Sequence, residues 1–431
     1  VRTEVISIPY RAADGSMARR DFTVWRTVHG PIVRTEADKW ISVQLMNKPV
    51  AALQQSFLRT KAVDLPAFMK ASEFRANSSN NTLFADDKGN IAYLHPQFVP
   101  VRDDRFDYTR PVDGSDPATA WKGEHQASTL PNVINPANGW VANSNNWPWS
   151  SAGADSPKAA DYPRYMDSAG ENPRGPHYIR VLTATPKFSR DSLLDAAYDP
   201  YLTAFADLVP TVVAAWDRLP AGDAMKDQLA APIAALRGWN FAAGEASVAT
   251  AVAAYWGNAL IARFGSNPDA RRNALVPFLV KHPSDRERLE TLALAVTALT
   301  ADFGKWDTPW GEINRFQRVN GALVQPFDDA KPSIPIGFAS AQWGSLASFG
   351  AKAWPGTKRW YGTYGNSFVA VVDFGATPSA RAVSAGGESG DPGSPHFNDQ
   401  AEMYRTHDFR QVHFTPEALK AHAKRTYSPG K

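Results

Sequence analysis

The segment Gly139–Pro148 holds the side chains best suited to chemistry in this 431-residue chain. Its sequence, GWVANSNNWP, places three asparagines (Asn143, Asn145 and Asn146) between two tryptophans. An asparagine amide fixed in an apolar cleft can donate a hydrogen bond to the oxyanion that develops when a carbonyl group is attacked. The same composition suits a network of Asx turns that stabilises a loop. The segment therefore indicates either an oxyanion-binding donor or a structural loop.

Several familiar catalytic and binding motifs are missing from the sequence. It has no HExxH, no Walker loop and no GxGxxG, and its nearest approach to a GxSxG elbow is the GESG of residues 387–390. It has no cysteine, which excludes disulfides, thiolate catalysis and cysteine-ligated metals. The nine histidines show no ligand-like spacing, so we expect them to be structural or surface residues.

Two further segments are rich in turn-forming residues. Thr27–Pro31 (TVHGP) is a β-branched strand end that runs into His-Gly-Pro, which is typical of a corner between a strand and a turn. Ser389–Phe397 (SGDPGSPHF) is a turn-dense loop before a helical stretch, and by itself it indicates no particular chemistry.

The composition is that of a globular protein with ample material for a core. Hydrophobic residues make up 43% and charged residues 21%, and the length allows two or three domains or one large one. Lys and Arg number 46 against 43 Asp and Glu, so the net charge is only +3. This balance argues against a nucleic acid or a membrane surface as a partner, since both need a concentrated basic face. No apolar run reaches the roughly 18–20 residues of a membrane span.

Hydrophobic patterning predicts the elements that position these segments. Strands are expected within residues 1–50, a helix follows from the spacing of Val50, Leu53 and Phe57, and a hairpin is expected around Asp86–Asn90. Residues 96–178 show little periodicity, and such a long irregular stretch is usually functional.

The second half of the chain is predicted to be helical and then to return to strands. Ser284 with Glu287 forms a capping box that opens a helix, strands are expected on both sides of Gly365-Asn366, and Thr415 opens a C-terminal helix. We therefore expect an α+β or αββα layered protein. Its parts are a β-rich core with long loops (1–188), a mainly helical segment (189–305) and a return to the β-core with a C-terminal helix (306–431).

Four segments together resemble the penicillin acylase family of N-terminal-nucleophile hydrolases, which includes the acyl-homoserine-lactone acylases. They follow the family's order over nearly the whole chain. FTVWRTVHG at 22–30 is similar to its TVWRTVHG strand, FADDKGNIAY at 84–93 to its YADxxGNIGY hairpin, NPANGWVANSNN at 135–146 to NPxxGYIANWNN, and SGDPGSPH at 389–396 to SGxPxSPH. The resemblance implies an α+β fold, an αββα sandwich with a helical insertion.

The resemblance also implies a mechanism and residue roles. In this family a serine at a new N-terminus attacks an amide carbonyl, and its own α-amino group serves as the base. By position in the motif, Asn145 is the side-chain donor of the oxyanion hole. The same alignment makes Arg174 a donor that orients this asparagine and the nucleophile, with a structural ion pair as the alternative.

The chain departs from the family at its first residue. Val1 has no nucleophilic side chain, and Ser7 and Ser16 are internal. We therefore expect the chain to begin inside a larger gene product, with the nucleophilic serine on a separate chain or an earlier segment. The presence of Asn145 and Arg174 favours this over a non-catalytic fragment.

Family resemblance further implies a structural Ca²⁺ between two subunits. Asp155 lies near the position of one family carboxylate, with the carbonyl of Tyr108 as a second contact, and a solvated loop aspartate is the alternative. No organic cofactor is expected. The implied partners are a processed small subunit or a serine-bearing segment, and the implied location is the periplasm.

Three classes of function follow from the sequence. The first is hydrolysis of an N-acyl amide, such as the side chain of a penicillin-type β-lactam, to a carboxylic acid and an amine, with acyl-homoserine-lactone hydrolysis as the alternative. The second is a binding or structural scaffold that lacks the nucleophile. The third is a carbohydrate-binding surface, suggested by the 14 tryptophans, although no paired-carboxylate motif supports glycosidase chemistry.

Overall fold

The computed structural model describes residues 1–270, 274–428 and 430. They divide into two compact units. The first unit is Val1–Val141 with Asp155–Ser168, and the second unit is Ala142–Ala154 with Ala169–Lys431. Both units contain helices and mainly antiparallel strands, which confirms the α+β class. None of the helices in the described ranges has the length and apolar character that a membrane crossing requires.

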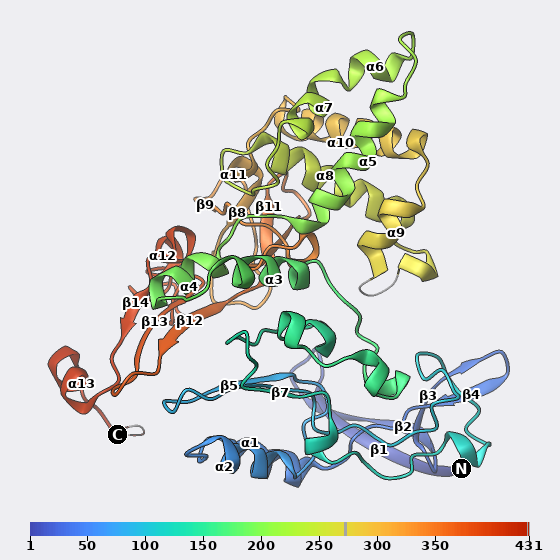
Figure 1. Cartoon of the computed structure of the whole chain (residues 1–431), viewed down its shortest axis with the longest axis vertical. Helices are drawn as coiled ribbons and strands as arrows, with labels where there is room; N and C mark the ends of the chain where they lie inside the picture. The colour runs from blue at the N-terminus through green and yellow to red at the C-terminus, as the bar shows by residue number, and fades with distance from the viewer. Residues whose placement is uncertain (271–273, 429, 431) are drawn as a thin grey trace. The chain divides into compact units, whose positions relative to one another are not determined.

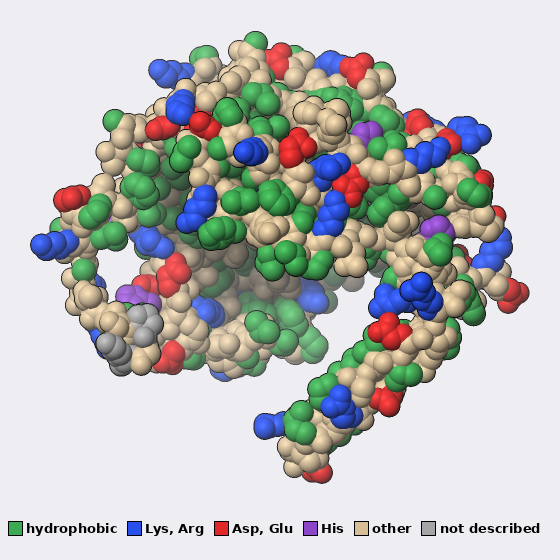
Figure 2. Space-filling model, turned by 90° about the horizontal axis from the view of Figure 1, so that it is seen from below, with side chains coloured by type: hydrophobic (Ala, Val, Ile, Leu, Met, Phe, Trp, Pro, Cys, Tyr) green, Lys and Arg blue, Asp and Glu red, His purple; other side chains and the backbone are tan. Residues whose placement is uncertain are grey.

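The first unit begins with a four-stranded antiparallel sheet. Its strands follow chain order and are β1 (Arg2–Arg11), β2 (Met17–Thr27), β3 (Gly30–Glu36) and β4 (Lys39–Ser42). β1 pairs with β2 along its whole length. Hydrophobic side chains of this hairpin stay exposed, among them Val5, Ile8 and Trp25, and green side chains are visible along the narrow arm in Figure 2. The turn after β2 is the predicted corner, where His29 Nε2 lies 2.8 Å from the carbonyl oxygen of Gly114.

A second sheet of the first unit contains the predicted hairpin. β5 (Thr82–Ala85), β6 (Ile91–Leu94) and β7 (Val133–Ile134) are antiparallel neighbours. The carboxylate of Asp86 shapes the hairpin turn by accepting hydrogen bonds from the backbone N–H groups of Lys88 and Asn90, at 3.0 and 2.9 Å. Helix α2 (Leu65–Ser72) packs on the sheet through Leu65.

Helix α1 (Pro49–Arg59) confirms the helix expected from apolar spacing, but its apolar side chains lie at the surface of the described chain. Val50, Leu53 and Phe57 are 62–73% exposed, whereas Gln55 is 1% exposed. The Gln55 amide donates a hydrogen bond to Gln97 Oε1 at 3.0 Å. A buried polar pair therefore anchors this helix within its unit.

The second unit is built around a helical core. Its helices are α3 (Arg174–Ala184), α4 (Arg190–Ala197), α5 (Thr203–Asp217), α6 (Ala224–Gln228), α7 (Ala230–Arg237), α8 (Val248–Phe264), α9 (Leu275–Lys281), α10 (Asp285–Phe303) and α11 (Trp310–Ile313). Figure 1 shows α5, α7, α8 and α10 side by side. α8 lies in the centre, where Val252 and Trp256 are fully buried. α10 begins with the predicted capping box between Ser284 and Glu287, which is confirmed.

Two small sheets complete the second unit. Their strand orders are β10-β11-β8-β9 and β12-β13-β14. The strands are β8 (Asn314–Phe316), β9 (Ile334–Pro335), β10 (Phe349–Ala353), β11 (Trp360–Gly365), β12 (Phe368–Asp373), β13 (Ser379–Ser384) and β14 (Arg410–Val412). The strands on either side of Gly365-Asn366 belong to different sheets, because Asn366 hydrogen-bonds Ser348 through both its side chain and its backbone N–H (2.7 and 2.9 Å).

The second unit also contains two helices near the C-terminus. α12 (Ala401–Thr406) and α13 (Pro416–His422) follow the last long loop, and the predicted start of α13 is confirmed, since Thr415 Oγ1 accepts from the backbone N–H of Ala418 at 3.2 Å. Residues 96–173 hold β7 and short 3₁₀ turns but no α-helix. This irregular stretch carries the asparagine segment, so hydrogen bonds must fix its conformation.

Candidate functional site

The asparagine segment forms a tight turn in the second unit. Asn145 adopts a left-handed backbone conformation with φ 63°, which asparagine tolerates better than most residues. Its backbone N–H donates to Asn143 Oδ1 at 3.0 Å, which closes an Asx turn. The turn leaves the side chain of Asn145 exposed while its neighbours Ser144 and Asn146 are buried.

Asn146 ties this turn to the body of the second unit. Its side-chain nitrogen Nδ2 lies 2.9 Å from both Ser150 Oγ and the Tyr178 hydroxyl, and 2.7 Å from Glu171 Oε1. Its oxygen Oδ1 accepts a hydrogen bond from the backbone N–H of Ser144 at 3.0 Å. Because Asn146 is only 1% exposed, these bonds compete little with water and hold the turn firmly.

Glu171 is the acceptor on which this network converges. Besides Asn146, its carboxylate receives hydrogen bonds from Trp147 Nε1 (3.1 Å), Ser150 Oγ (2.7 Å) and the backbone N–H of Asn172 (2.9 Å). Four neutral donors can stabilise a carboxylate without a cation. Gly175 packs directly against this carboxylate, and a larger residue would not fit there, because a Cβ atom at Gly175 would lie 2.1 Å from Glu171 Oε1.

Arg174, the first residue of α3, contacts the exposed asparagine directly. Its Nη2 donates to Asn145 Oδ1 at 2.9 Å and also to the carbonyl oxygen of Ser144. A guanidinium has only donors, so the Asn145 oxygen must face Arg174 and the amide nitrogen Nδ2 must face away. That nitrogen makes no hydrogen bond with the residues the structure describes. Asn145 therefore presents an unused, oriented N–H donor.

Arg174 lies at a position where a positive charge destabilises a helix. A cation at the first residue of a helix interacts unfavourably with the helix dipole, and burial lowers the pKa of this guanidinium from its usual value. Its Nε is buried and has no hydrogen-bond partner in the described chain. The arrangement is therefore better explained by its contact with Asn145 than by helix stability.

A cavity of about 240 Å³ opens beside this pair, entirely within the second unit. One side is polar and includes Asn145 and Arg174, and the other side includes the apolar Leu275 and Val276 at the start of α9. The full lining is Asn145, Asn172, Pro173, Arg174, Leu275, Val276, Ala341 and Gln342. A bound molecule could place an oxygen against the asparagine donor and an apolar group against α9.

The structure thus brings together two residues that sequence reasoning had singled out, Asn145 and Arg174. Their catalytic roles stay predictions. Sequence reasoning missed Glu171, because an acidic residue 25 positions from its partner leaves no periodic signal. It also missed Leu275 and Val276, which read as ordinary core residues of a helix. The ENPRG run at 171–175 was the one available signal, since it crowds a carboxylate, a proline and a glycine at a helix start.

Asp155 lies in the first unit and does not line this cavity. Its Oδ2 accepts the backbone N–H of Asn138 at 2.8 Å. Ca²⁺ takes about six to eight oxygen ligands, and the described residues hold no group of three or more His, Asp or Glu side chains placed for a metal. These residues by themselves do not make a calcium site, so a calcium ion at Asp155 stays a prediction that needs further oxygen ligands.

Comparison with known proteins identifies the family of the chain. The profile of a family described as penicillin amidase matches residues 1–421. Penicillin G acylase of Escherichia coli is 34% identical over 131 residues, covering 30% of this chain and 15% of the relative. Penicillin acylase 2 proenzyme of Pseudomonas sp. (strain SE83) is 24% identical over 428 residues, covering 89% and 51%. The chain thus spans about half the length of the second relative and less of the first.

A solved structure shares the fold. A thermostable penicillin G acylase from Alcaligenes faecalis superposes with a TM-score of 0.65 at 19% identity, over 99% of this chain and 81% of that one. At this identity the likeness is one of fold. It confirms the predicted α+β architecture.

Proposed function

Since the chain belongs to the penicillin amidase family, we propose that it forms a portion of the large subunit of an acylase that hydrolyses an N-acyl amide to a carboxylic acid and an amine. The observation that carries the proposal is the free Nδ2 donor of Asn145. It is aimed away from Arg174 and lies at the edge of a cavity with an apolar side.

The nucleophile in this proposal is a serine at the N-terminus of another segment or chain of the same precursor, as the family resemblance implies. Its hydroxyl attacks the amide carbonyl carbon while its α-amino group takes the proton. The carbonyl oxygen becomes an oxyanion, and the leaving amine departs with a proton. Water then releases the acid from the acyl-enzyme.

Within this reaction the chain supplies electrostatic stabilisation. Asn145 Nδ2 donates to the oxyanion, and removing one such donor costs about 100–1,000-fold in turnover. Arg174 acts through Asn145, because its bond to Oδ1 fixes the amide's orientation and polarises the N–H. Its positive charge also makes the potential at the cavity more favourable for an oxyanion.

A penicillin-type β-lactam is the leading substrate class. Both curated relatives carry penicillin acylase names, and the apolar side made by Leu275 and Val276 suits a hydrocarbon group of the substrate. An N-acyl-homoserine lactone presents the same amide next to an apolar chain and is the second candidate. A processed small subunit, a structural Ca²⁺ and a periplasmic location accompany the proposal as predictions of family resemblance.

The proposal is tested with paired variants of the enzyme assembled with its serine-bearing segment. Asn145→Ala removes the donor, and Asn145→Asp keeps the size and the tolerance for a left-handed backbone but replaces the donor with an acceptor. Both are expected to lower kcat by about 100–1,000-fold on penicillin G or an acyl-homoserine lactone. Thermal unfolding of Asn145→Asp should stay near that of the parent. Asn398→Ala, an exposed asparagine outside the cavity, is the control.

Retention of near-full turnover by both Asn145 variants would remove this residue from the mechanism. The alternative of a scaffold without catalysis has its own test. Denaturing mass spectrometry with N-terminal sequencing of the protein from its natural source should reveal a chain or segment that begins with serine. A preparation without one, inactive on both substrate classes, would favour the scaffold.

A further inference from the structure

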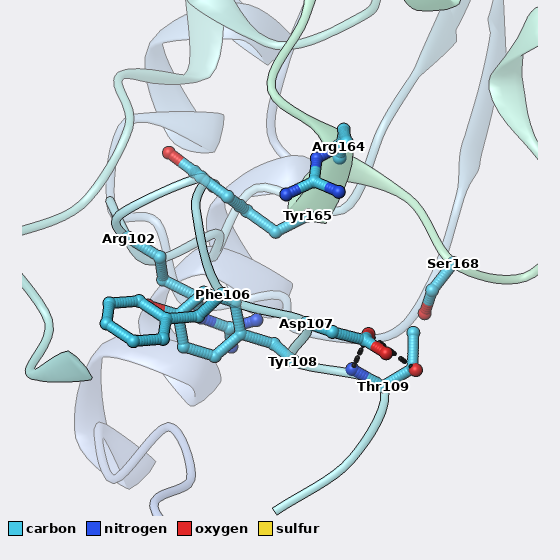
Figure 3. Close-up of a pocket in the computed structure, with 8 residues that line it drawn as sticks. All are labelled: Arg102, Phe106, Asp107, Tyr108, Thr109, Arg164, Tyr165 and Ser168. Atoms are coloured by element: carbon cyan, nitrogen blue, oxygen red, sulfur yellow. Dashed lines mark hydrogen bonds between the residues drawn. The ribbon is translucent and has the colours of Figure 1, made fainter. Parts of the chain in front are cut away.

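A second cavity, of about 80 Å³, lies wholly within the first unit. It is formed by the loop of residues 102–109 and by the segment 164–168, and Figure 3 shows the side chains that line it. The lining combines cations, aromatic rings and hydroxyl groups, namely Arg102, Phe106, Asp107, Tyr108, Thr109, Arg164, Tyr165 and Ser168. None of these residues lines the cavity beside Asn145, and Tyr108 is also the residue whose carbonyl the family resemblance implies as a calcium contact.

Arg102 is the unusual member of this lining. Its guanidinium lies over the ring of Tyr108 (5.0 Å to the centroid) and near that of Trp121 (5.8 Å). It makes no hydrogen bond or ion pair with the described residues, and its Nε is buried without a partner. Partial burial of an arginine costs solvation free energy that a paired anion normally offsets, and here burial lowers the pKa of Arg102. The side chain is thus half-buried, cationic and unpaired.

The neighbouring charges are already engaged. Arg105, on the same loop, pairs with Asp103 at 2.8 Å, and Arg164 lies 3.6 Å from the carboxylate of Asp104. Asp107 accepts hydrogen bonds from the backbone N–H and the hydroxyl of Thr109, at 2.9 and 2.6 Å. Figure 3 shows the Asp107 carboxylate turned toward Thr109. No acidic side chain of the described unit therefore neutralises Arg102.

We propose that this cavity is a binding site for a monoanionic carboxylate, with Arg102 as its anchor. A planar guanidinium fork matches the two oxygens of a carboxylate. Phe106, Tyr108 and Tyr165 add aromatic rings to the lining. Inorganic phosphate is a poorer match, because Asp104 and Asp107 lie close by and repel a second negative charge. The small volume accepts a carboxylate head group rather than a whole metabolite.

The proposal is independent of amide hydrolysis and is tested by binding alone. The full chain is titrated calorimetrically with formate, acetate and benzoate at constant ionic strength, with chloride and inorganic phosphate as competitors. One charge-assisted pair in a partly open cavity should give a dissociation constant on the order of 1 mM. Arg102→Gln should weaken binding by about tenfold or more, and Arg102→Lys should fall between, because it keeps the charge and loses the fork.

Arg105→Gln is the matched control, since Arg105 lies on the same loop but is exposed and paired with Asp103. It should bind carboxylates like the parent. The source of the carboxylate is assigned with a short peptide that has either a free or an amidated C-terminus. Binding of the free acids, or of the peptide with the free C-terminus alone, supports the site. Equal binding of the amidated peptide, a preference for phosphate, no binding, or unchanged affinity in a folded Arg102→Gln variant overturns it.

Discussion

At the residue scale, the neighbours of Asn145 make its side-chain amide available as a hydrogen-bond donor. The amide group is symmetrical in shape, and only the donor-only guanidinium of Arg174 at 2.9 Å decides that oxygen faces inward and N–H faces outward. The left-handed backbone at φ 63° lifts the side chain out of the turn. The proposed oxyanion donor is therefore a product of two contacts rather than of residue type alone.

The residue expected to maintain this geometry is Glu171. Glutamine at this position keeps the shape but replaces one acceptor oxygen with an NH₂ group, which cannot accept from Trp147 Nε1 or Ser150 Oγ. Leaving buried donors unpaired should cost about 1–3 kcal/mol of unfolding free energy. We expect Glu171→Gln to lower kcat with little change in KM, since the turn that orients Asn145 loosens while the cavity walls remain.

Glu388→Gln serves as the control for this measurement. Glu388 is distant from Glu171 in the sequence and forms an exposed ion pair with Arg410. Steady-state kinetics and chemical denaturation of both variants decide the matter. A Glu171→Gln enzyme that loses stability but keeps kcat would show that the network is structural only.

At the element scale, helix α8 links the core to the cavity wall. A Cβ atom at Gly257 would lie 2.6 Å from the ring of Trp343, which is 4% exposed and stacks on Phe205. Trp343 follows directly after Ala341 and Gln342, two residues that line the cavity beside Asn145. The glycine is therefore required by close packing, and its effect reaches the proposed site.

Gly257→Ala separates helix propensity from packing. Propensity alone favours alanine by about 1 kcal/mol, but overpacking against the buried tryptophan should reverse the sign and destabilise the protein by about 1–3 kcal/mol. Gly238→Ala is the control for packing, since Gly238 caps α7 with a right-handed helical backbone and its Cβ would meet nothing closer than 3.5 Å. The midpoint temperature of thermal unfolding should fall for Gly257→Ala. For Gly238→Ala it should rise or stay unchanged. Equal stabilisation of both would show that Trp343 moves freely.

Element prediction succeeded where the signal is local. The capping box at Ser284, the Asp86 hairpin turn and the start of α13 depend on residues within four positions of one another. The prediction of elements was incomplete where the hydrogen-bond partners of a strand lie far apart in the sequence. The strands around Gly365-Asn366 joined different sheets because Asn366 bonds to Ser348, 18 residues earlier. The predicted boundaries at residues 188 and 305, between the β-rich parts and the helical segment, stay a prediction about the order of elements along the chain.

At the scale of the whole molecule, one buried histidine should give stability a pH dependence. His95 is 3% exposed, and burial lowers its pKa to about 4 from 6.5, against the hydrogen bond to the Met166 carbonyl, which acts to raise it. As the pH falls below about 6.5, His95 is protonated in the unfolded chain before it is protonated in the folded protein. The contribution of neutral His95 to the free energy of unfolding is therefore fully present above that pH and decreases toward pH 4. The full effect is about 3 kcal/mol.

Urea denaturation of the parent, His95→Gln and His422→Gln measures this effect. The parent and the exposed control His422→Gln should lose stability in parallel between pH 6.5 and 4, while His95→Gln should lose less over the same range. Parallel loss in all three proteins would mean that other groups, chiefly carboxylates, account for the acid sensitivity.

The sequence by itself determined the family and the fold class and singled out Asn145 and Arg174 as candidate site residues, because four ordered segments and local capping and turn signals can be recognised along the chain. Only the tertiary structure decided which donor of Asn145 is free, that Glu171 anchors the turn, and that α9 supplies the apolar wall. Likewise Arg102 reads as one arginine among many until the fold leaves it unpaired over two rings. Hydrogen bonds and packing between residues distant in sequence are set by the folded backbone, so no local pattern encodes them.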